Sequence, residues 1–314
     1  MEHIQLSEIP QLENALLIGA FSGWNDAASA ATWAIKFLVN QWESTQFAEI
    51  DPDYFFDFTE RRPTTRITGG NLRRLTWPAN RFFAHKAERT DEGLIGRDTI
   101  LLLGDEPHLH WKTFVGEVLQ LCQSAGVTEM TLLGSLVAEV PHTAPVPVSG
   151  AATQPAMLRR LDTAGIQRAQ YEGPTGILSV LQDSGRREGF ITSSIWGTVP
   201  HYVSASPNLP VSEALLGALN SIHHFDLRLH DLSRAARRFT QRVSSLVAED
   251  PEVSAYVREL EERNESGDLG ISPEDASGIH KVPLGGELPT PEEAINEIEE
   301  WLRQTREDDD DTLN

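Results

Sequence analysis

The sequence predicts an α/β protein: a three-layer α/β/α domain with a mainly parallel sheet, followed by a C-terminal helical appendage. Two observations support this prediction. Short aliphatic runs alternate along the chain with segments whose apolar residues recur every three or four positions, which is the spacing of a helix with one buried face. The aliphatic runs are apolar throughout, as is typical of strands buried on both faces of a parallel sheet.

The first two pairs of strand and helix lie in the N-terminal half. Residues 14–20 form an aliphatic run that predicts a strand, and the apolar stripe over residues 24–42 predicts the helix after it. Residues 99–103 predict the next strand. The stripe over residues 111–122 then predicts a helix that Gly126 ends.

Two further strands and three helices follow in the second half. Residues 129–133 and 190–195 are apolar runs that predict strands, and residues 211–222 predict the helix after the second of them. Beyond this point the stripes over residues 229–246 and 253–260 predict the two helices of the appendage.

The segment between the first helix and the second aliphatic strand has a different pattern. Residues 66–68, 72–76 and 80–85 are short, polar and aromatic, and two glycines and an asparagine at residues 69–71 are typical of a tight turn. We therefore expect strands here, two of them joined as a hairpin.

These elements predict a core domain and an extension. Residues 1–228 form the α/β/α core, and residues 229–304 form a helical C-terminal extension with a flexible linker at about residues 266–290. Within the extension, residues 291–304 predict an amphipathic helix whose apolar side must dock on another surface. Residues 305–314 are expected to be a disordered acidic tail, because a run of like charges repels itself and stays solvated.

Charge and hydropathy exclude several classes of partner. The 314 residues include 26 Lys and Arg against 47 Asp and Glu, so the formal net charge is −21. We find no basic cluster in the sequence, so nucleic acid is not an expected partner. No stretch approaches the roughly 18 apolar residues that a membrane span needs, and Met1–Pro10 carries acids where a signal peptide carries bases. We expect a cytoplasmic protein without a membrane partner.

Polar and aromatic side chains collect just after four of the predicted strands, within residues 22–26, 105–108, 135–143 and 196–202. The carboxyl ends of parallel strands share one edge of a sheet, and ligands bind there. We therefore expect these four groups of side chains to face one another. The segment 171–176, with two glycines and a proline before an apolar helical run, is a further candidate for that edge.

Acid–base chemistry is one interpretation of these groups. Glu106 or Glu172 beside His142 or His201 would form a carboxylate and imidazole pair, in which the carboxylate orients the ring and raises the pKa of the histidine. The alternative is structural: each histidine donates a hydrogen bond to the backbone or to a carboxylate.

Simple capping is the competing interpretation of two other candidates. Asn25 and Asp26 stand just before an alanine-rich stripe, so either can cap that helix, and Thr175 stands just before an apolar run that it can cap. No His, Cys, Asp or Glu spacing is diagnostic of a metal, and neither a P-loop nor a G-x-S-x-G elbow is present. We expect no metal and no cofactor.

Five motifs, in this order, resemble the proteasome assembly chaperone 2 family in its bacterial, actinobacterial form. They occupy residues 23–28, 104–107, 134–148, 171–176 and 196–202. The resemblance extends over about residues 12–225. It implies a phosphorylase- or hydrolase-like fold and a homo-oligomer such as a trimer. Eukaryotic members assist the assembly of proteasome rings, so the resemblance also implies a protein partner.

Two functions follow as hypotheses. The first is a protein-binding or assembly-type role, and the second is a small-molecule enzyme of hydrolase or phosphorylase type that uses a carboxylate and histidine pocket at the edge of the sheet. The candidate binding pocket for either function comprises Gly23, Trp24, Asp26, Glu106, His142, Thr143, Gly173, Thr175, Gly176, Trp196, His201 and Tyr202.

Overall fold

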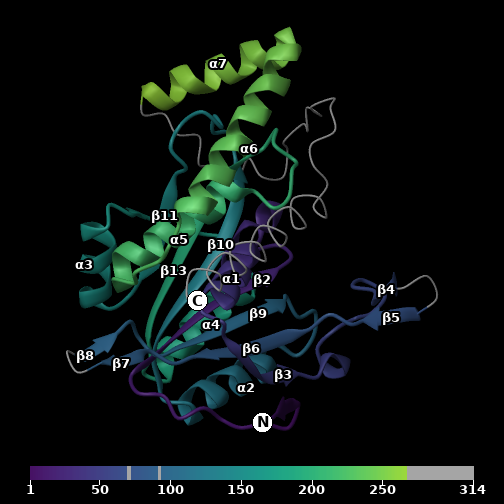
Figure 1. Ribbon diagram of the computed structural model, residues 1–314, viewed down its shortest axis with the longest axis vertical. Coiled ribbons are helices and arrows are strands. Elements are labelled where there is room, and N and C mark those ends of the chain that lie inside the picture. Colours follow the sequence, from purple (N-terminus) through teal and green to yellow (C-terminus); the bar gives the residue numbers. More distant parts are fainter. Residues whose placement is uncertain (69–71, 91–92, 267–314) are drawn as a thin grey trace, which may run out of the picture.

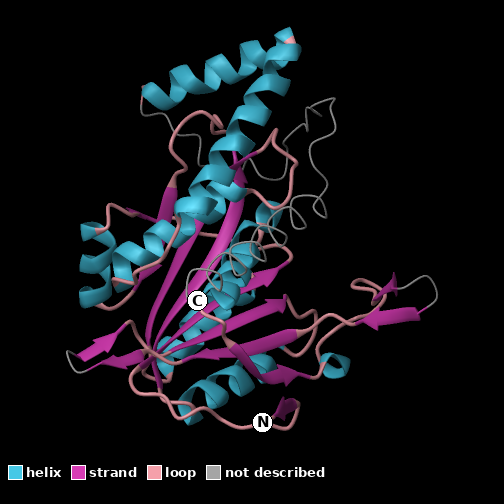
Figure 2. Cartoon of the chain, viewed as in Figure 1, coloured by secondary structure: helices cyan, strands magenta, loops and turns pink. Residues whose placement is uncertain are grey.

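The computed structural model describes residues 1–68, 72–90 and 93–266. One large sheet runs through the molecule with helices on both of its faces (Figures 1 and 2). In spatial order its strands are β1 (Ile4–Leu6), β3 (Thr45–Ile50), β6 (Asn80–His85), β9 (Thr99–Asp105), β2 (Ala15–Ser22), β10 (Val127–Ala138), β13 (Ile191–Pro200), β11 (Val148–Ala152) and β12 (Gln167–Arg168). Two short hairpins, β4 (Thr64–Thr68) with β5 (Leu72–Thr76) and β7 (Glu88–Thr90) with β8 (Gly93–Ile95), form separate sheets.

The four central strands β9, β2, β10 and β13 all run parallel. On one side of them β6, β3 and β1 are antiparallel to their neighbours, and on the other side β11 is antiparallel to β13. The α/β class is confirmed, and the sheet is mixed rather than mainly parallel, because the flanking strands β1, β3, β6 and β11 join it in antiparallel pairs. The carboxyl ends of the four central strands share one edge, as predicted, and a bridge between Asp26 and Ser135 joins the loop after β2 to β10 there.

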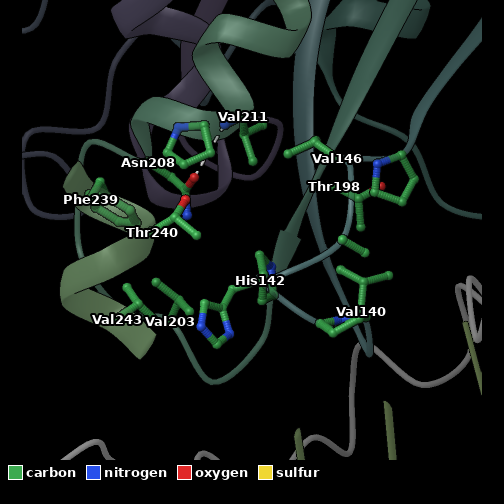
Figure 3. Close-up of a pocket in the computed structure, with 15 residues that line it drawn as sticks. Val140, His142, Val146, Thr198, Val203, Asn208, Val211, Phe239, Thr240 and Val243 are labelled. Atoms are coloured by element: carbon green, nitrogen blue, oxygen red, sulfur yellow. Dashed lines mark hydrogen bonds between the residues drawn. The ribbon is translucent and has the colours of Figure 1, made fainter. Parts of the chain in front are cut away.

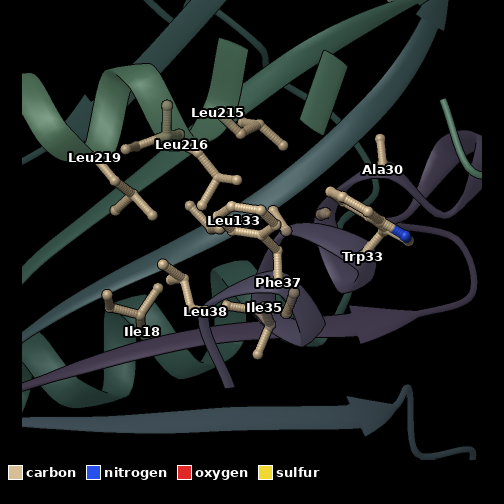
Figure 4. Close-up of a cluster of buried hydrophobic side chains, with 14 of the residues drawn as sticks. Ile18, Ala30, Trp33, Ile35, Phe37, Leu38, Leu133, Leu215, Leu216 and Leu219 are labelled. Atoms are coloured by element: carbon tan, nitrogen blue, oxygen red, sulfur yellow. The ribbon is translucent and has the colours of Figure 1, made fainter. Parts of the chain in front are cut away.

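Alternate residues of the central strands face two apolar layers. Leu16 and Ile18 of β2 pack with α1 (Ala30–Gln41) and α5 (Leu209–His223), as Figure 4 shows for Ile18. Leu17 and Phe21 point to the opposite face, where α2 (Trp111–Ser124) and α4 (Ile177–Arg187) cover the sheet. A smaller helix, α3 (Pro155–Thr163), joins the first layer. The period of two along a strand therefore builds the three-layer architecture that the sequence predicts.

Two short 3-10 helices, η1 (Ala27–Ser29) and η2 (Pro52–Tyr54), lie in loops of the core. The C-terminal helices are α6 (His230–Glu249) and α7 (Pro251–Glu265). Pro251 follows Asp250, whose carboxylate accepts hydrogen bonds from the first backbone N–H groups of α7, so one helix ends there and the next begins.

The helix α6 links the main core to the appendage. Leu232 and Ala236 in its first half belong to the main apolar cluster, whereas Val243 and Val247 pack with α7. In Figure 1 the far half of α6 and all of α7 extend beyond the carboxyl edge of the sheet. The domain boundary at residue 228 stays a prediction. The linker beyond residue 266, the helix at residues 291–304 and the tail at residues 305–314 lie outside the described residues.

Several elements differ from the sequence prediction in length or were not predicted. The strands β10 and β13 are longer than the aliphatic runs that indicated them, because small polar residues such as Ser135 and Thr198 are buried inside the sheet. The strands β1, β3 and β11 were missed, since each is short and only partly apolar. The predicted pairing of β4 with β5 is confirmed, while the turn at residues 69–71 lies outside the described residues.

Candidate functional site

The Glu106 carboxylate joins three segments at the carboxyl edge of the sheet. Its Oε1 accepts hydrogen bonds from Asn25 Nδ2 at 2.7 Å and from the backbone nitrogen of Ile177 at 2.8 Å, and its Oε2 accepts from the backbone nitrogen of Trp24 at 3.3 Å. The backbone nitrogen of Glu106 donates to the carbonyl oxygen of Ser22 at 2.9 Å. The loops after β2 and β9 and the start of α4 are thus held by one side chain, here called the Glu106 hub.

The helix α4 depends on the Glu106 hub for its N-terminal cap. Its N-cap residue is Gly176, which has no side chain to accept a hydrogen bond, so Thr175 is not the cap that the sequence suggested. Glu106 supplies both the acceptor and a negative charge at the positive end of the helix dipole. A Cβ atom at Gly176 would lie 2.4 Å from the Asn25 amide and 2.6 Å from Glu106 Oε1, so any larger residue displaces the side chains that make these hydrogen bonds.

The remaining candidates of this segment are on the surface. Glu172, Gly173 and Thr175 are exposed, and Glu172 has no hydrogen bond or ion pair with any residue in the described part of the chain. Tyr171 is 45% exposed, and its hydroxyl donates to the carbonyl oxygen of Pro174 at 2.6 Å. The side chain of Glu172 is therefore not placed beside an imidazole.

Asp26 caps the first helix. Its Oδ1 accepts hydrogen bonds from the backbone nitrogens of Ala31 at 2.8 Å and Thr32 at 3.2 Å, and its Oδ2 accepts from the Thr32 hydroxyl. The residue before α1, Ser29, has left-handed backbone geometry and its side chain makes no capping bond. Burial raises the pKa of Asp26, and the hydrogen bonds from Thr32 and Ala31 oppose that rise. This geometry supports the capping interpretation.

His142 is enclosed between the core and α6. Its backbone nitrogen donates to the Tyr202 hydroxyl at 2.7 Å, its Nδ1 lies 2.7 Å from the same hydroxyl, and its Nε2 lies 2.9 Å from Ser244 Oγ. A neutral ring with the proton on Nε2 satisfies all three contacts, because the Tyr202 hydroxyl then donates to Nδ1. Burial lowers the pKa of His142, with the charge of Glu261 opposing it, and favours that neutral ring. Burial also raises the pKa of Tyr202.

His201 and Thr143 belong to the same contact region. The His201 ring lies edge to face against Tyr202 and Tyr256, and its centroid is 5.4 Å from the first ring and 5.5 Å from the second. Burial lowers the pKa of His201, and the charge of Glu139 opposes that shift. Thr143 Oγ1 donates to Glu261 Oε1 of α7 at 2.5 Å. An ion pair of 2.8 Å between Arg263 and Glu139 adds to these contacts.

The histidine candidates therefore fasten the appendage to the sheet edge. Tyr202 and Val203 form an apolar cluster with Val243, Val253 and Leu260, among others, directly beside the polar contacts of His142. Ser244 and Glu261 were not singled out in the sequence. They are polar positions on amphipathic helices, where a solvated side chain is the ordinary expectation.

A small pocket opens beside His142 (Figure 3). Besides His142 it is lined mainly by Val140, Val146, Val203, Val211, Phe239 and Val243, with Thr198, Asn208 and Thr240 as polar members. Of the four candidate acid–base residues only His142 belongs to this lining. The room for a water-sized sphere is about 20 Å³, which holds one or two water molecules rather than a metabolite.

The predicted residues therefore divide into two groups at one edge. Gly23, Trp24 and Gly176 surround the Glu106 hub, whereas His142 and His201 lie under the appendage. Trp196 covers Gly134 on the sheet, where a Cβ atom would come within 2.5 Å of the indole ring. Among the described residues, no group of three or more His, Cys, Asp or Glu side chains is arranged to hold a metal ion, and no helix is long and apolar enough to cross a membrane.

A second buried network, which the sequence analysis did not identify, lies near the amino-terminal end of β10. Glu129 forms ion pairs with Arg97 at 2.9 Å and Arg160 at 3.0 Å, and its Oε1 lies 3.5 Å from His223 Nδ1. His223 Nε2 lies 2.8 Å from the Thr131 hydroxyl. The order carboxylate, imidazole, hydroxyl resembles a catalytic triad, but the side chains of Glu129 and His223 are only 3% and 1% exposed. No substrate reaches them, so the network is structural.

Comparison with known proteins gives one family. The PAC2 family profile matches residues 20–247. A PAC2 family protein from Streptomyces avermitilis is 37% identical over 77% of this chain and 99% of its own, with a TM-score of 0.69. A proteasome-assembly chaperone homologue from Mycobacterium tuberculosis is also 37% identical over the same shares of the two chains, with a TM-score of 0.68.

A more distant structure extends the likeness in fold. PbaB of Pyrococcus furiosus, an archaeal proteasome activator, is 19% identical over 77% of this chain and 97% of its own, with a TM-score of 0.61. No curated protein sequence matches the chain.

Proposed function

This chain belongs to the PAC2 family, and from that premise we propose that it is a protein-binding factor with an assembly-type role. The binding surface is the carboxyl edge of the sheet around the Glu106 hub. The partner is a proteasome subunit in the cytoplasm, because the relative from M. tuberculosis, which is 37% identical, is a proteasome-assembly chaperone homologue.

One observation carries the proposal: each of the three segments joined by Glu106 presents an exposed apolar side chain. Trp24 follows β2 and is 63% exposed, Leu109 follows β9 and is 44% exposed, and Tyr171 precedes α4 and is 45% exposed. Aromatic side chains on a rigid frame are frequent anchors of protein interfaces. The hub fixes the backbone of these loops, so they present their side chains with little loss of conformational freedom on binding.

The alternative, a hydrolase or phosphorylase, receives less support from the same geometry. An acid–base pair requires a carboxylate and an imidazole at one cavity open to a substrate. Glu106 instead holds backbone and amide nitrogens, and both nitrogens of the His142 ring contact hydroxyl groups. These side chains are occupied by contacts that stabilise the fold, which favours the binding role.

Self-association belongs to the same proposal. The family resemblance favours a homo-oligomer such as a trimer, and apolar side chains such as Trp24 and Trp77 remain exposed on a single chain. Light scattering on the purified protein measures this directly. A mass that stays at one chain over the accessible concentration range contradicts it.

Binding is tested by mixing the purified chain with the proteasome subunits of its own organism and measuring affinity. Trp24→Ala and Tyr171→Ala are each expected to weaken binding by about tenfold or more. Ile191→Ala is the matched control, because Ile191 is an exposed apolar residue (36%) at the start of β13, on the opposite edge of the sheet. Equal affinity of all three variants, or no complex with the unaltered chain, contradicts the proposal.

A further inference from the structure

The hairpin of β4 and β5, here called the arm, projects from the body of the molecule (Figure 1). Among the described strands, β4 and β5 pair only with each other and form a separate two-stranded sheet. The side chains of residues 64–67 and 73–76 are all exposed. A two-stranded hairpin without a covering layer is only marginally stable in water. The arm is therefore expected to lean on another surface.

One face of the arm brings two positive charges together. Arg66 lies directly opposite Arg74 in the antiparallel register, and like charges in this position destabilise a strand pair. Neither these two side chains nor Arg73 forms an ion pair with any residue that the structure describes. A carboxylate-bearing surface would relieve this repulsion.

The other face of the arm carries two apolar side chains and one arginine. The register pairs Thr65 with Leu75 and Ile67 with Arg73, so Ile67, Leu75 and Arg73 lie on one face, opposite to the face of Arg66 and Arg74. Ile67 is 64% exposed and Leu75 is 50% exposed. The surface that covers the arm must therefore offer apolar side chains as well as negative charge.

The charge of the arm contrasts with that of the rest of the chain. Residues 61–77 contain five arginines and no Asp, Glu or Lys, within a protein whose net charge is −21. The expectation of no basic cluster was wrong at this point, since strand pairing brings together arginines that are separated along the sequence. The positive charge of the arm is complementary to an acidic partner.

We propose that the arm binds the acidic segment at residues 291–304 of the same chain. This segment lies outside the described residues, but its sequence has the required chemistry: five glutamates and one arginine, together with Ile295, Ile298 and Trp301 at helical spacing. The apolar residues cover Ile67 and Leu75, and the glutamates pair with Arg73 on the same face of the arm. This contact goes beyond the proposed function, because it occurs within one chain.

The connection is long enough for the segment to reach the arm. Residues 267–290, which follow α7, number 24 and span up to about 80 Å when extended. A tethered segment also meets the arm at a higher effective concentration than a free partner. Occupation by the same chain is therefore favoured over occupation by a second copy.

Amide hydrogen exchange of β4 and β5 in the full chain tests the proposal through the substitution Arg73→Glu. In a free arm residue 73 is paired with Ile67, so the substitution creates no like-charge pair across the strands and exchange does not become faster. In a docked arm it places a carboxylate against the glutamates of residues 291–304, so exchange is expected to become about tenfold faster.

A compensating variant and a control complete the experiment. Adding Glu299→Lys and Glu300→Lys to Arg73→Glu is expected to restore slow exchange, whereas Arg237→Glu, the same charge change at an exposed arginine of α6, is expected to leave exchange in the arm unaltered. Unaltered or slower exchange in Arg73→Glu, or no rescue by the lysines, overturns the proposal. Protection of the arm that rises with protein concentration also overturns it, since a second copy is then the occupant.

Discussion

Glu106 Oε1 lies 2.8 Å from the backbone nitrogen of Ile177, so a side chain in the loop after β9 caps a helix that begins 71 residues later. The same oxygen accepts from Asn25, which follows β2. One carboxylate thus sets the relative position of three segments at the carboxyl edge of the sheet. The proposed binding surface is built on those segments.

Removal of the Glu106 carboxylate is predicted to destabilise the protein. Glu106→Ala leaves the first backbone N–H of α4 and the buried Asn25 amide without their acceptor, at a cost of roughly 1–3 kcal/mol in the free energy of unfolding. Glu106→Gln keeps an acceptor oxygen but loses the charge at the helix terminus, so the loss is smaller. Denaturant unfolding measures both, and an alanine variant as stable as the unaltered chain contradicts the role of the hub.

Substitution of Gly176 is predicted to disrupt the same contacts by steric conflict alone. Its φ of −94° suits any residue, but a Cβ atom would lie 2.4 Å from the Asn25 side chain. Gly176→Ala is therefore expected to lower the melting temperature. Gly116→Ala is the control: a Cβ atom there meets nothing within 4 Å, and alanine favours the helix α2 by up to about 1 kcal/mol. A Gly176→Ala variant as stable as the Gly116→Ala variant would contradict the predicted steric conflict between position 176 and the Asn25 side chain.

Loss of His142 is predicted to loosen the appendage but not the core. In His142→Ala the Ser244 and Tyr202 hydroxyl groups lose their shared partner, so amide exchange in α7 and in the second half of α6 is expected to become faster while that in α1 stays slow. Ser244→Ala should add little in the His142→Ala background, because both changes remove one contact. His230→Ala, an exposed histidine at the start of α6, is the control. Uniform acceleration across the molecule contradicts the local role.

The pH dependence of stability is predicted to report on His223. Burial lowers its pKa to about 4 from 6.5, with the charge of Glu129 opposing that shift. Because the unfolded chain takes up this proton at higher pH than the folded chain, the free energy of unfolding falls as the pH is lowered from about 6.5 toward 4, by up to about 3 kcal/mol.

His223→Gln isolates this contribution. The amide retains a hydrogen-bond partner for Thr131 and does not titrate, so the curve of unfolding free energy against pH should be flatter between pH 6.5 and 4. The Glu129 carboxylate stays in both proteins. Its lowered pKa gives a loss of stability in the same direction at lower pH. Curves with the same slope in this window would assign the acid sensitivity to other groups.

Much of the fold could be predicted because local patterns determine it. Continuous aliphatic runs indicated β2 and β9, and the topology of parallel strands placed their loops at one edge, as the hydrogen bond from the Glu106 backbone to Ser22 confirms. The short strands β1 and β3 could not be predicted in this way. Their few residues are held by pairing with a neighbour, which leaves little periodic signal.

The partners of the site residues were less accessible to prediction. His142 contacts Ser244, and Thr143 contacts Glu261, only because α6 and α7 dock on the edge, and no local pattern encodes that docking. One signal was available. The helix α4 begins after Gly176 without a capping side chain, so its first N–H groups required an acceptor from elsewhere in the fold.

The most direct test of the central claim is the amide-exchange footprint of the full chain with and without the proteasome subunits of its organism. The account predicts slower exchange on complex formation at residues 23–26, at residues 107–110 and at residues 171–176, the three segments around Glu106. The start of β13 on the opposite edge should not change. Slower exchange confined to that opposite edge, with none around Glu106, would contradict it.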